Sequence, residues 1–560
     1  MRQTSFILGA LALAAATAVQ AAPSTPWAAT RTMRHDVGAA TAGAALQAGE
    51  TVHIAVTLKL RHQAELDALT TALMSGQTSR HITRAEFMAQ HAPTDAQVQA
   101  VVAHLQAAGF RDISVAANHL VISANGSAAT VQSAFNTELR HFVVDGRDAY
   151  ANVSDAQVPA HLGGIVNAVH GLQNVTRHHT MLARPANGPT VAAAAAAQAA
   201  AATGKAVGHN PTEFPAIYNA SAMPAATSTS IAIISEGDIS QTLADLDTFA
   251  AGAGFPAPNV TKVVVGAPGT DTSGVVEWNM DSQSSLSAAG GQVANMTFYV
   301  ATTLDDAPLT EAYNQAVVDN TARAINVSLG ECETGAKNSG IEASNDAIFQ
   351  VAVAQGQVFS VSSGDSGSFE CGSKKGGQSY PAVSPYVIAV GGTKLLTTNQ
   401  TTWSSESVWA CTTALTCQLL GGAGGGASIT ENAPAWQLSS GVLGNGTKRG
   451  MPDISFDADP SSGAMVLVGS KTEQVGGTSL AAPLFTGFWA RVQHANGNAL
   501  VFPASALYQF GPANGPKMFH DVTKGSNGGY TAGAGWDYAS GFGSLNVGKF
   551  AAFVKTHPGF

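Results

Sequence analysis

The chain has 560 residues, a net charge of −10 and only 11% charged residues, while 45% of its residues are hydrophobic. No basic stripe runs along it, which excludes a nucleic-acid-binding protein, and its hydrophobic content is high enough to build cores, which excludes a disordered chain. The length exceeds one ordinary core, so two or more domains are expected.

Residues 1–22 have the pattern of a secretory signal peptide. Arg2 provides the positive start, residues 6–19 form an apolar run, and Val19 and Ala21 are small residues at −3 and −1 of a cleavage site after Ala21 or Ala22. The run is short for a membrane span and no other stretch qualifies, so an N-terminal anchor is the weaker interpretation. We expect a monomer that is exported through the periplasm and secreted, with no membrane or nucleic-acid partner.

Residues 23–178 are expected to form an α+β domain. Apolar and polar residues alternate over 52–60, which predicts a half-buried strand. Thr94 to Gln97 match a capping box, apolar residues follow at helical spacing, and Gly109 closes the predicted helix. The other predicted elements are a strand or hairpin over 113–122 and a helix over 131–139.

The stretch 179–210 is expected to be a linker that contains a processing site. Residues 192–202 are alanine except for one glutamine, and prolines and glycines flank them. Such a run can form a helix. An exposed segment between two domains is also a natural site of proteolysis.

Residues 211–560 have the pattern of a doubly wound α/β domain. Short apolar runs alternate with helix-like stretches at 240–250 and 310–322. Runs this apolar are typical of strands buried on both faces of a mostly parallel sheet. The predicted strands are 231–234, 263–265, 296–300, 325–329, 358–361, 387–390 and 465–468.

Export makes disulfides possible, and the chain has four cysteines that allow three pairings. Sequence proximity favours Cys411 with Cys417, which leaves Cys332 for Cys371. None of the four lies in a CxxC pattern, so structural disulfides are favoured over a zinc site.

Ser479 is the first candidate catalytic residue, in a segment from Gly476 to Pro483 that looks like the nucleophile segment of subtilisin-like peptidases. A helix is predicted over 480–493, which places the hydroxyl where free N–H groups favour negative charge. The bland alternative is a helix N-cap serine. No histidine occurs between Asn210 and Gln493, so the usual imidazole base of a serine nucleophile is missing.

Two carboxylates can replace that base. Glu277 and Asp281 are spaced i, i+4 and therefore share one face of a predicted helix. Such a pair splits its titration, and the member with the higher pKa can act as a base in acid. The alternative is a solvated helix face, although Val276, Trp278 and Met280 leave little solvated surface nearby.

A third candidate is Asp365, which follows the predicted strand 358–361 in the segment 362–367. Ligands of open α/β sheets collect at the carboxyl ends of the strands. A protonated Asp365 there can donate a hydrogen bond to an oxyanion. The alternative is an ordinary aspartate turn.

Together the segments 277–281, 363–365 and 477–479 resemble the sedolisin family, the serine-carboxyl peptidases, in its bacterial xanthomonalisin type. The resemblance implies that Ser479 is the nucleophile, Glu277 the general base and Asp281 its orienting partner, with Asp365 completing the oxyanion hole. It also implies a subtilisin-like catalytic domain behind a ferredoxin-like propeptide. One departure is Gly476-Gly477, where the family usually has Ser-Gly.

The same resemblance implies one structural Ca²⁺ near the C-terminus. Its ligands would be the carboxylates of Asp521 and Asp537 and the carbonyls of Val522, Gly533 and Gly535, a set of oxygen donors that suits a hard cation. The alternative is a pair of surface loops with turn-forming residues.

The function expected from these features is that of a secreted, acid-acting serine-type endopeptidase for polypeptide substrates, which works through an acyl-enzyme and is made as an autoprocessed zymogen. Its own propeptide would be its inhibitor and chaperone. Twelve of the 16 histidines lie before residue 180, and histidine gains charge near pH 6 to 7. Acidification is therefore expected to loosen the propeptide.

Other function classes fit less well. A subtilisin needs an upstream histidine, and the His170-Gly171 pair lies in the expected propeptide; a chymotrypsin loop over 364–367 lacks one too. Residues 271–274 and 365–367 approach the motifs of an aspartic peptidase, but pepsin-like folds are almost all β. An inactive secreted homologue or a binding protein remains as an alternative.

Overall fold

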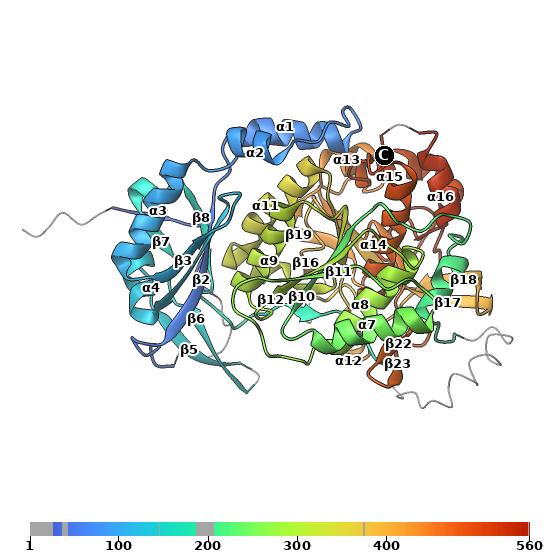
Figure 1. Ribbon diagram of the computed structural model, residues 1–560, viewed down its shortest axis with the longest axis horizontal. Helices are drawn as coiled ribbons and strands as arrows, with labels where there is room; N and C mark the ends of the chain where they lie inside the picture. The colour runs from blue at the N-terminus through green and yellow to red at the C-terminus, as the bar shows by residue number, and fades with distance from the viewer. Residues whose placement is uncertain (1–25, 36–42, 145, 186–205, 373–375, 558) are drawn as a thin grey trace, which may run out of the picture.

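The computed structural model describes residues 26–35, 43–144, 146–185, 206–372, 376–557 and 559–560. An N-terminal domain and a larger C-terminal domain pack against each other (Figure 1). The predicted signal peptide and the alanine run of the predicted linker lie outside the described residues. Within the part of the chain that is described, no helix combines the length and the apolar character that a membrane span needs.

The N-terminal domain is built on a four-stranded antiparallel sheet in the order β3 (Arg111–Val115), β4 (Val121–Ser127), β2 (Thr51–Leu58) and β8 (Val166–His170). The helices α3 (Asp95–Ala108) and α4 (Ala128–Phe135) cover its outer face (Figure 1). The Thr94 capping box and the Gly109 C-cap of α3 are as predicted. The hairpin expected over 113–122 is the β3–β4 pair.

Two sequence predictions for this domain were wrong in detail. The helix expected over 131–139 ends at Phe135, because Asn136 adopts the left-handed conformation and caps it. Strand β2 was expected to be half-buried, yet both of its faces are covered. One face packs into the core of its own domain, and the other lies against α9 (Asp306–Asp319) and α11 (Ile341–Gln355) of the C-terminal domain.

The C-terminal domain contains an eight-stranded sheet, and its strands are parallel except for β18. The helices α9 and α11 lie between this sheet and the N-terminal domain, while α7 (Ser240–Gly252), α8 (Val275–Ala288) and α14 (Thr478–Ala495) cover the other face (Figure 1). The predicted doubly wound, mostly parallel α/β fold is therefore confirmed. In order the strands are β11 (Val260–Val264), β12 (Met296–Ala301), β10 (Ile231–Glu236), β13 (Ala324–Val327), β15 (Val358–Ser362), β17 (Ile388–Asn399) and β18 (Thr402–Val408), with β21 (Ile454–Asp457) also paired to β17.

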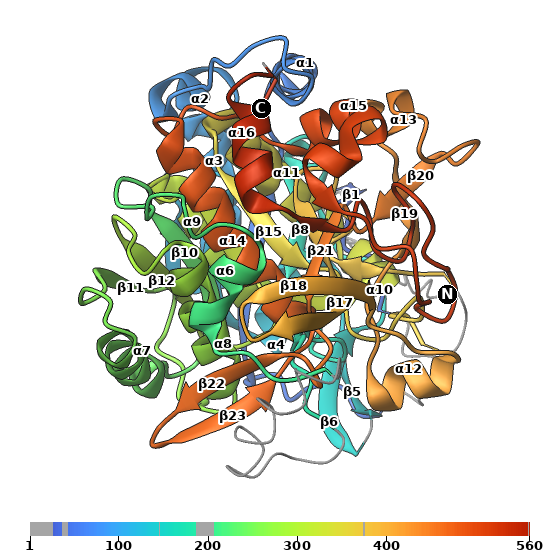
Figure 2. The ribbon, with the colours of Figure 1, turned by 90° about the vertical axis from the view of Figure 1, so that its right-hand side faces the viewer.

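One predicted strand lies outside this sheet. Residues 465–468 fall in β22 (Ala464–Val468), which pairs with β23 (Lys471–Val475) as a hairpin at the edge of the domain and has one further bridge, to His209 (Figure 2). Gly469 adopts φ 60° and reverses the chain at once, so the neighbouring segment becomes the partner of β22. The hairpin covers α8 instead of extending the sheet.

The remaining elements connect and cover these layers. In the N-terminal half they are β1 (Trp27–Ala29), α1 (Gln63–Met74), α2 (Arg84–Gln90), β5 (Leu139–Val144), β6 (Arg147–Asn152), β7 (Gln157–Pro159) and β9 (His179–Thr180). In the C-terminal domain they are α6 (Phe214–Ile217), β14 (Leu329–Cys332), α10 (Glu333–Ser339), β16 (Ser379–Tyr380), α12 (Ala414–Leu420), β19 (Gly426–Asn432), α13 (Ala435–Ser439), β20 (Lys448–Met451), α15 (Ala504–Asn514), β24 (Phe519–His520), β25 (Ser544–Leu545) and α16 (Val547–Val554).

Both favoured disulfides are present. Cys332 is bonded to Cys371 and Cys411 to Cys417, so each of the four cysteines is paired. The first bond ties the end of β14 to the loop after β15, beside the strand ends that form the candidate site.

Candidate active site

Ser479 lies in the first turn of α14, where its side chain is completely buried. The helix begins after Gly477, which adopts φ 102°. A side chain at that position would collide with the backbone of Met181 and approach Asp365 Oδ2, so only glycine fits. The predicted placement of the hydroxyl at a helix N-terminus is confirmed.

Glu277 and Asp281 lie on α8, which packs directly against α14. Their side chains are 1% and 0% exposed. Every residue of α8 from Val276 to Ala288 is buried, because α7, α14 and the β22–β23 hairpin surround the helix. The alternative of a solvated helix face is therefore wrong.

Ser328 connects the paired acids to the serine. Its hydroxyl donates to Asp281 Oδ1 at 2.6 Å, and its carbonyl accepts a hydrogen bond from the Ser479 hydroxyl at 3.3 Å. Glu277 lies near Asp281, Ser479 and Asp365, which all act on its pKa. Neither Glu277 oxygen has a hydrogen bond of ordinary geometry to the described residues. The carboxylate is therefore adjacent to the serine but not yet engaged with it.

Burial dominates the electrostatics of this pair. It raises the pKa of Glu277 well above its ordinary value, the negative charge of Asp281 raises it further, and the hydroxyls of Ser479 and Ser328 act in the opposite direction. Burial also raises the pKa of Asp281, against the hydroxyl of Ser328 and the amide of Asn326. Two buried carboxyls this close retain a proton between them well above pH 4.

Asp365 follows β15 and faces the start of α14. Its Oδ1 accepts hydrogen bonds from the Thr478 N–H and the Thr478 hydroxyl, both at 2.8 Å. Its Oδ2 lies against Gly477 and has no hydrogen-bond partner among the described residues. Burial raises the pKa of Asp365 to about 7, and the two Thr478 hydrogen bonds lower it less. Below neutral pH the group is a carboxylic acid, and its proton belongs on Oδ2 because Oδ1 already accepts twice.

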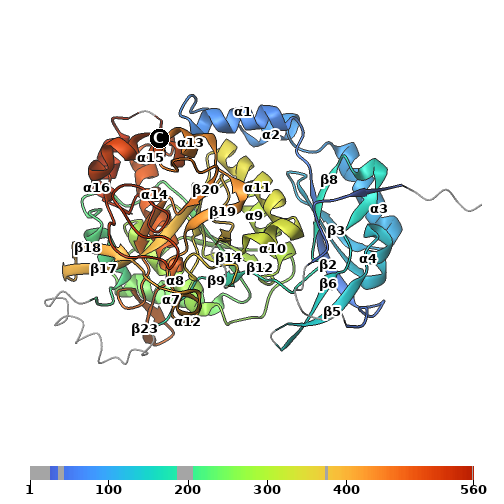
Figure 3. The same ribbon diagram turned by 180° about the vertical axis from the view of Figure 1, so that it is seen from behind.

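The first residues of the predicted linker lie inside this site. β9 pairs antiparallel with β14 (Figure 3), and the Ser479 N–H donates to the Met181 carbonyl at 3.1 Å. The hydrogen bonds of Ser479 to other residues therefore involve Ser328 and Met181, and none found among the described residues involves a histidine.

Sequence reasoning missed Ser328, Thr478 and the segment around Met181. Ser328 lay inside the predicted strand 325–329, whereas β13 ends at Val327 and Ser328 directly follows it, at the strand end where the site forms in such sheets. Thr478 could have been found as the neighbour of Ser479. The position of Met181 depends on how two domains dock and has no local signal.

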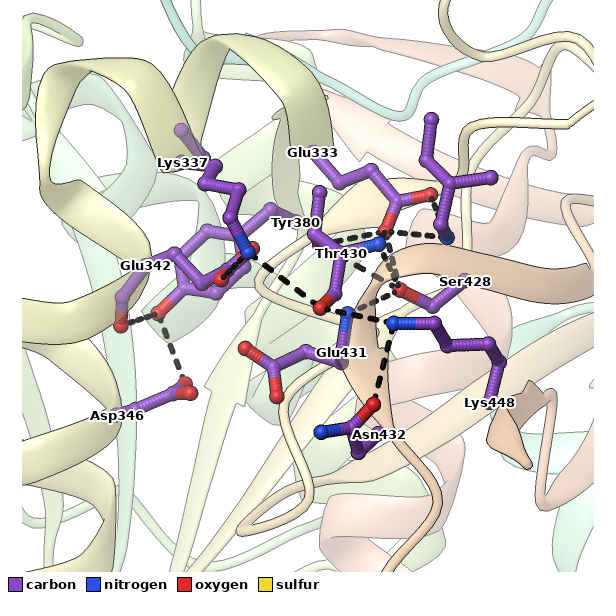
Figure 4. A network of polar contacts seen from close by, with 12 residues as sticks. Glu333, Lys337, Glu342, Asp346, Tyr380, Ser428, Thr430, Glu431, Asn432 and Lys448 are labelled. Atoms are coloured by element: carbon purple, nitrogen blue, oxygen red, sulfur yellow. Dashed lines mark hydrogen bonds and ion pairs between the residues drawn. The ribbon is translucent and has the colours of Figure 1, made fainter. Parts of the chain in front are cut away.

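A polar network lies beside the paired strands β14 and β16 (Figure 4). The Glu333 carboxylate accepts hydrogen bonds from the N–H groups of Gln378, Ile429 and Thr430. It thereby ties the residue before β16 to strand β19. Lys337 bridges to Glu342 Oε1 at 3.3 Å from the same side. A buried carboxyl group with several donors therefore connects α10, β16 and β19 beside β14.

The residues expected to hold Ca²⁺ lie together in the C-terminal loops. Asp521 Oδ2 accepts from the Gly535 N–H at 3.0 Å, and Asp537 Oδ2 accepts from the Gly533 N–H at 2.9 Å. The Val522 carbonyl accepts from the Ser540 hydroxyl at 3.4 Å, and that hydroxyl also contacts Asp537. Two carboxylates share one glycine loop with several carbonyls, which is a donor set that fits Ca²⁺.

A second group of acids lies at the domain interface. His178, Asp306 and Glu331 are buried side chains whose ligand atoms lie within 4.8 Å of one another, and they are the one such set of three found in the described part of the chain. The predicted calcium residues do not belong to it. Its histidine comes from the N-terminal domain and its two acids from the C-terminal domain.

Comparisons with known proteins agree with this architecture. Residues 39–175 match the pro-kumamolisin activation domain, and residues 238–509 match the subtilase family. The chain is 47% identical to sedolisin of Pseudomonas sp. (strain 101) over 494 residues, which is 85% of this chain and 82% of that protein. It is 45% identical to xanthomonalisin of Xanthomonas sp. (strain T-22) over 85% of this chain and 62% of that protein.

The solved structure of Pseudomonas sedolisin, a serine-carboxyl proteinase complexed with two molecules of pseudo-iodotyrostatin, covers 64% of this chain and 100% of its own, with a TM-score of 0.61 and 45% identity. These relatives and the α/β sheet exclude a pepsin-like aspartic peptidase. The chain belongs to the sedolisin family of serine-carboxyl peptidases, and its subtilisin-like domain is preceded by an activation domain.

Proposed function

We propose that this chain is a secreted endopeptidase that works in acid with Ser479 as nucleophile, Glu277 as general base, Asp281 as its orienting partner and neutral Asp365 in the oxyanion hole. The observation that carries the proposal is the burial of Ser479, Glu277 and Asp281 together, with half-buried Asp365 at the start of the same helix and without histidine among the described contacts of Ser479. A buried carboxyl pair supplies a base whose pKa suits acidic media.

The reaction follows from these positions. Glu277 accepts the Ser479 proton while the hydroxyl oxygen attacks the scissile carbonyl, and Asp281 holds Glu277 in place with Ser328 as its own hydrogen-bond donor. The Ser479 N–H and the Asp365 acid group stabilise the oxyanion. Protonated Glu277 then gives its proton to the leaving amine, and water resolves the acyl-enzyme by the same proton route.

An endopeptidase rather than an exopeptidase is supported by the course of the chain through the cleft. The described residues run into it through β9 and leave it through Ala183, which is bridged to Gly476 on the far side of Ser479. The cleft therefore accepts a polypeptide that continues in both directions.

In the proposed zymogen, residues 1–22 are the signal peptide, 23–178 the propeptide, 179–210 the linker and 211–560 the peptidase. The zymogen is inhibited because the first residues of the linker, directly after the propeptide, cover Ser479. Several histidines of the propeptide are buried, and burial lowers the pKa of His170 and His178 to about 3. A histidine whose pKa is lowered on docking opposes docking once the pH falls below 6.5, so acid favours release.

The calcium loop is proposed to hold one structural Ca²⁺ through Asp521, Asp537 and the carbonyls of Val522, Gly533 and Gly535. The ion would supply positive charge that fixes the two carboxylates and the glycine loop, and it has no part in the proposed proton transfers.

The experiment that tests the function compares the secreted chain with Ser479→Ala and with Ser287→Ala. Ser287 is another buried serine, on α8, and no hydrogen bond joins its side chain to the four groups in the described part of the chain. Hydrolysis of denatured protein at pH 4 should fall by roughly 10⁵ to 10⁶ in Ser479→Ala and stay within a few-fold in Ser287→Ala. Higher activity of the parent chain at pH 8 than at pH 4 would contradict the proposal.

A further inference from the structure

The segment from His178 to Ala183 lies extended in the active-site cleft with a defined register. β9 pairs with β14 so that His179 faces Gly330 and Thr180 faces Leu329. The Met181 N–H then donates to the Ser328 carbonyl at 3.2 Å.

On the other side of the serine, Ala183 and Gly476 exchange two backbone hydrogen bonds, at 3.0 and 2.9 Å. The chain is thus held by backbone hydrogen bonds before and after the two peptide bonds that flank Leu182, and of these two only the Met181–Leu182 bond has a carbonyl that accepts from the Ser479 N–H. Such pairing on both sides is how an extended peptide is aligned on a strand edge.

The Met181 carbonyl occupies the position that a scissile carbonyl needs. Its oxygen accepts from the Ser479 N–H at 3.1 Å. A Cβ atom added to Gly477 would lie 2.0 Å from this oxygen and 2.7 Å from Asp365 Oδ2, so the oxygen and the acid group approach the same point. One proposed oxyanion donor, the Ser479 N–H, therefore already contacts this carbonyl, and the other, Asp365, lies beside the same glycine with its Oδ2 unpartnered among the described residues.

We propose that the Met181–Leu182 peptide bond is the bond that Ser479 cleaves first, within its own chain, and that this cut starts activation. The proposal rests on the function proposed above. The Ser479 oxygen forms an ester with the Met181 carbonyl carbon while its proton moves to Glu277. The bond to the Leu182 nitrogen breaks as that nitrogen takes the proton, and water then hydrolyses the ester to a Met181 carboxyl group and restores the serine.

Two side chains anchor the segment in this register. Met181 is 1% exposed, and its terminal methyl lies against Gly330, where an added Cβ would be 2.5 Å away. Three residues upstream, His178 is enclosed by Asp306 and Glu331, with 3.8 Å between its ring nitrogens and their oxygens. The His179 side chain between them is exposed. We infer that the residue before the first cut is chosen by the site that buries Met181 and that His178, enclosed by Asp306 and Glu331, fixes the register at neutral pH, before acidification.

The test follows the full-length chain after a shift from neutral to acidic pH, with intact-mass spectrometry and N-terminal sequencing at each time point. The first new N-terminus should be Leu182, the first new C-terminus Met181, and the rate constant should not change over a 100-fold range of protein concentration. Later trimming of the released ends does not bear on the first cut.

Three variants sharpen this test. Met181→Lys puts a charge into the site that buries Met181 and should slow the first cut by about 100-fold or more, because even small misfits in apolar pockets cost about 10- to 200-fold. Met181→Leu keeps an apolar residue and should cut at the same bond. His179→Gln changes only an exposed side chain and should cut at the parental rate.

The outcomes separate this inference from the proposed function. A first cut at another bond, in a chain that then hydrolyses added protein, overturns the inference alone. The inference is also overturned if the Ser479→Ala chain acquires the Leu182 N-terminus at the parental rate, since another peptidase must then have made the cut. A chain that is never cut and hydrolyses no protein in acid, even when its linker is opened by an added peptidase, overturns the proposed function. If Met181→Lys fails to fold, the terminus formed by the parent chain still decides.

Discussion

Asp365 offers a direct test of the oxyanion hole, because its two oxygens have different tasks. Oδ1 accepts from Thr478, while Oδ2 is free of protein donors among the described residues and is oriented toward the Met181 carbonyl position. Replacing it with asparagine keeps an oxygen for Thr478 and offers a permanent N–H at the second position. Replacing it with alanine removes both.

The magnitude follows from the pKa and from the value of one donor. With burial raising the pKa of Asp365 to about 7, about 99.9% of the group is neutral at pH 4 and about 10% at pH 8. One oxyanion donor contributes about 2.7 to 4 kcal/mol, so Asp365→Ala should lower kcat at pH 4 by roughly 10² to 10³. Asp365→Asn should stay within about tenfold of the parent there. Above pH 7 its activity relative to the parent should rise by up to about tenfold per pH unit, because only the parent loses its donor.

The assay is the pH profile of kcat/KM from pH 3 to 8 on a chromogenic peptide. Each variant zymogen is first matured by a trace of parent enzyme, which is then removed, and a thermal melt confirms that the variant is folded. Near-parental activity of Asp365→Ala would refute the role of Asp365. Equal losses in both variants would also refute hydrogen-bond donation and would leave only a structural role in holding Thr478.

Three further predictions concern stability and activation. Burial raises the pKa of Asp346 to about 7 and of Glu370 to about 8. As the pH rises, these two carboxyl groups therefore ionise in the unfolded chain at a lower pH than in the folded chain. Above about pH 4.5 the free energy of unfolding should fall by up to about 1.4 kcal/mol per group and pH unit. A Tm of mature Ser479→Ala protein that is as high at pH 7 as at pH 4.5 would contradict this. Burial lowers the pKa of His81 to about 4, so His81→Gln should remove about 2 kcal/mol of acid destabilisation of the docked propeptide at pH 5. The midpoint pH of propeptide release, measured by gel filtration of the Ser479→Ala zymogen, should therefore move to lower pH. An unchanged midpoint would argue against a role of His81. His53→Gln is the matched control. Burial acts to lower the pKa of His53, but its contact with the Glu311 carboxylate outweighs burial and raises the pKa. A histidine whose pKa is raised on docking strengthens docking in acid, so this variant should not shift release to lower pH. EGTA should lower the Tm of the parent by about 5 °C or more and leave Asp537→Ala unchanged, and a parent Tm insensitive to EGTA would argue against the calcium loop.

Much of the fold could be predicted because its signals are local. The capping box at Thr94, the glycine after α3 and the apolar runs of β10, β12 and β15 depend on neighbours within one element. Elements whose partners lie far away in the chain were placed less well. β22 looks like a sheet strand by composition, but the turn at Gly469 gave it a different partner.

The candidate site divides in the same way. The shared face of Glu277 and Asp281 follows from helix geometry alone, and the lack of a histidine between Asn210 and Gln493 is visible in the sequence. Ser328 and Met181 reached the site through strand ends and domain docking, which no local pattern reports.

By itself the sequence determined the order of most elements and the pair of acids on one helical turn, because each depends on bonds between near neighbours. The tertiary structure alone decided the protonation of those acids and the residue that lies over Ser479. Both depend on burial and on contacts between segments hundreds of residues apart, since a carboxyl group keeps its proton near neutral pH only where the rest of the fold has removed the water around it.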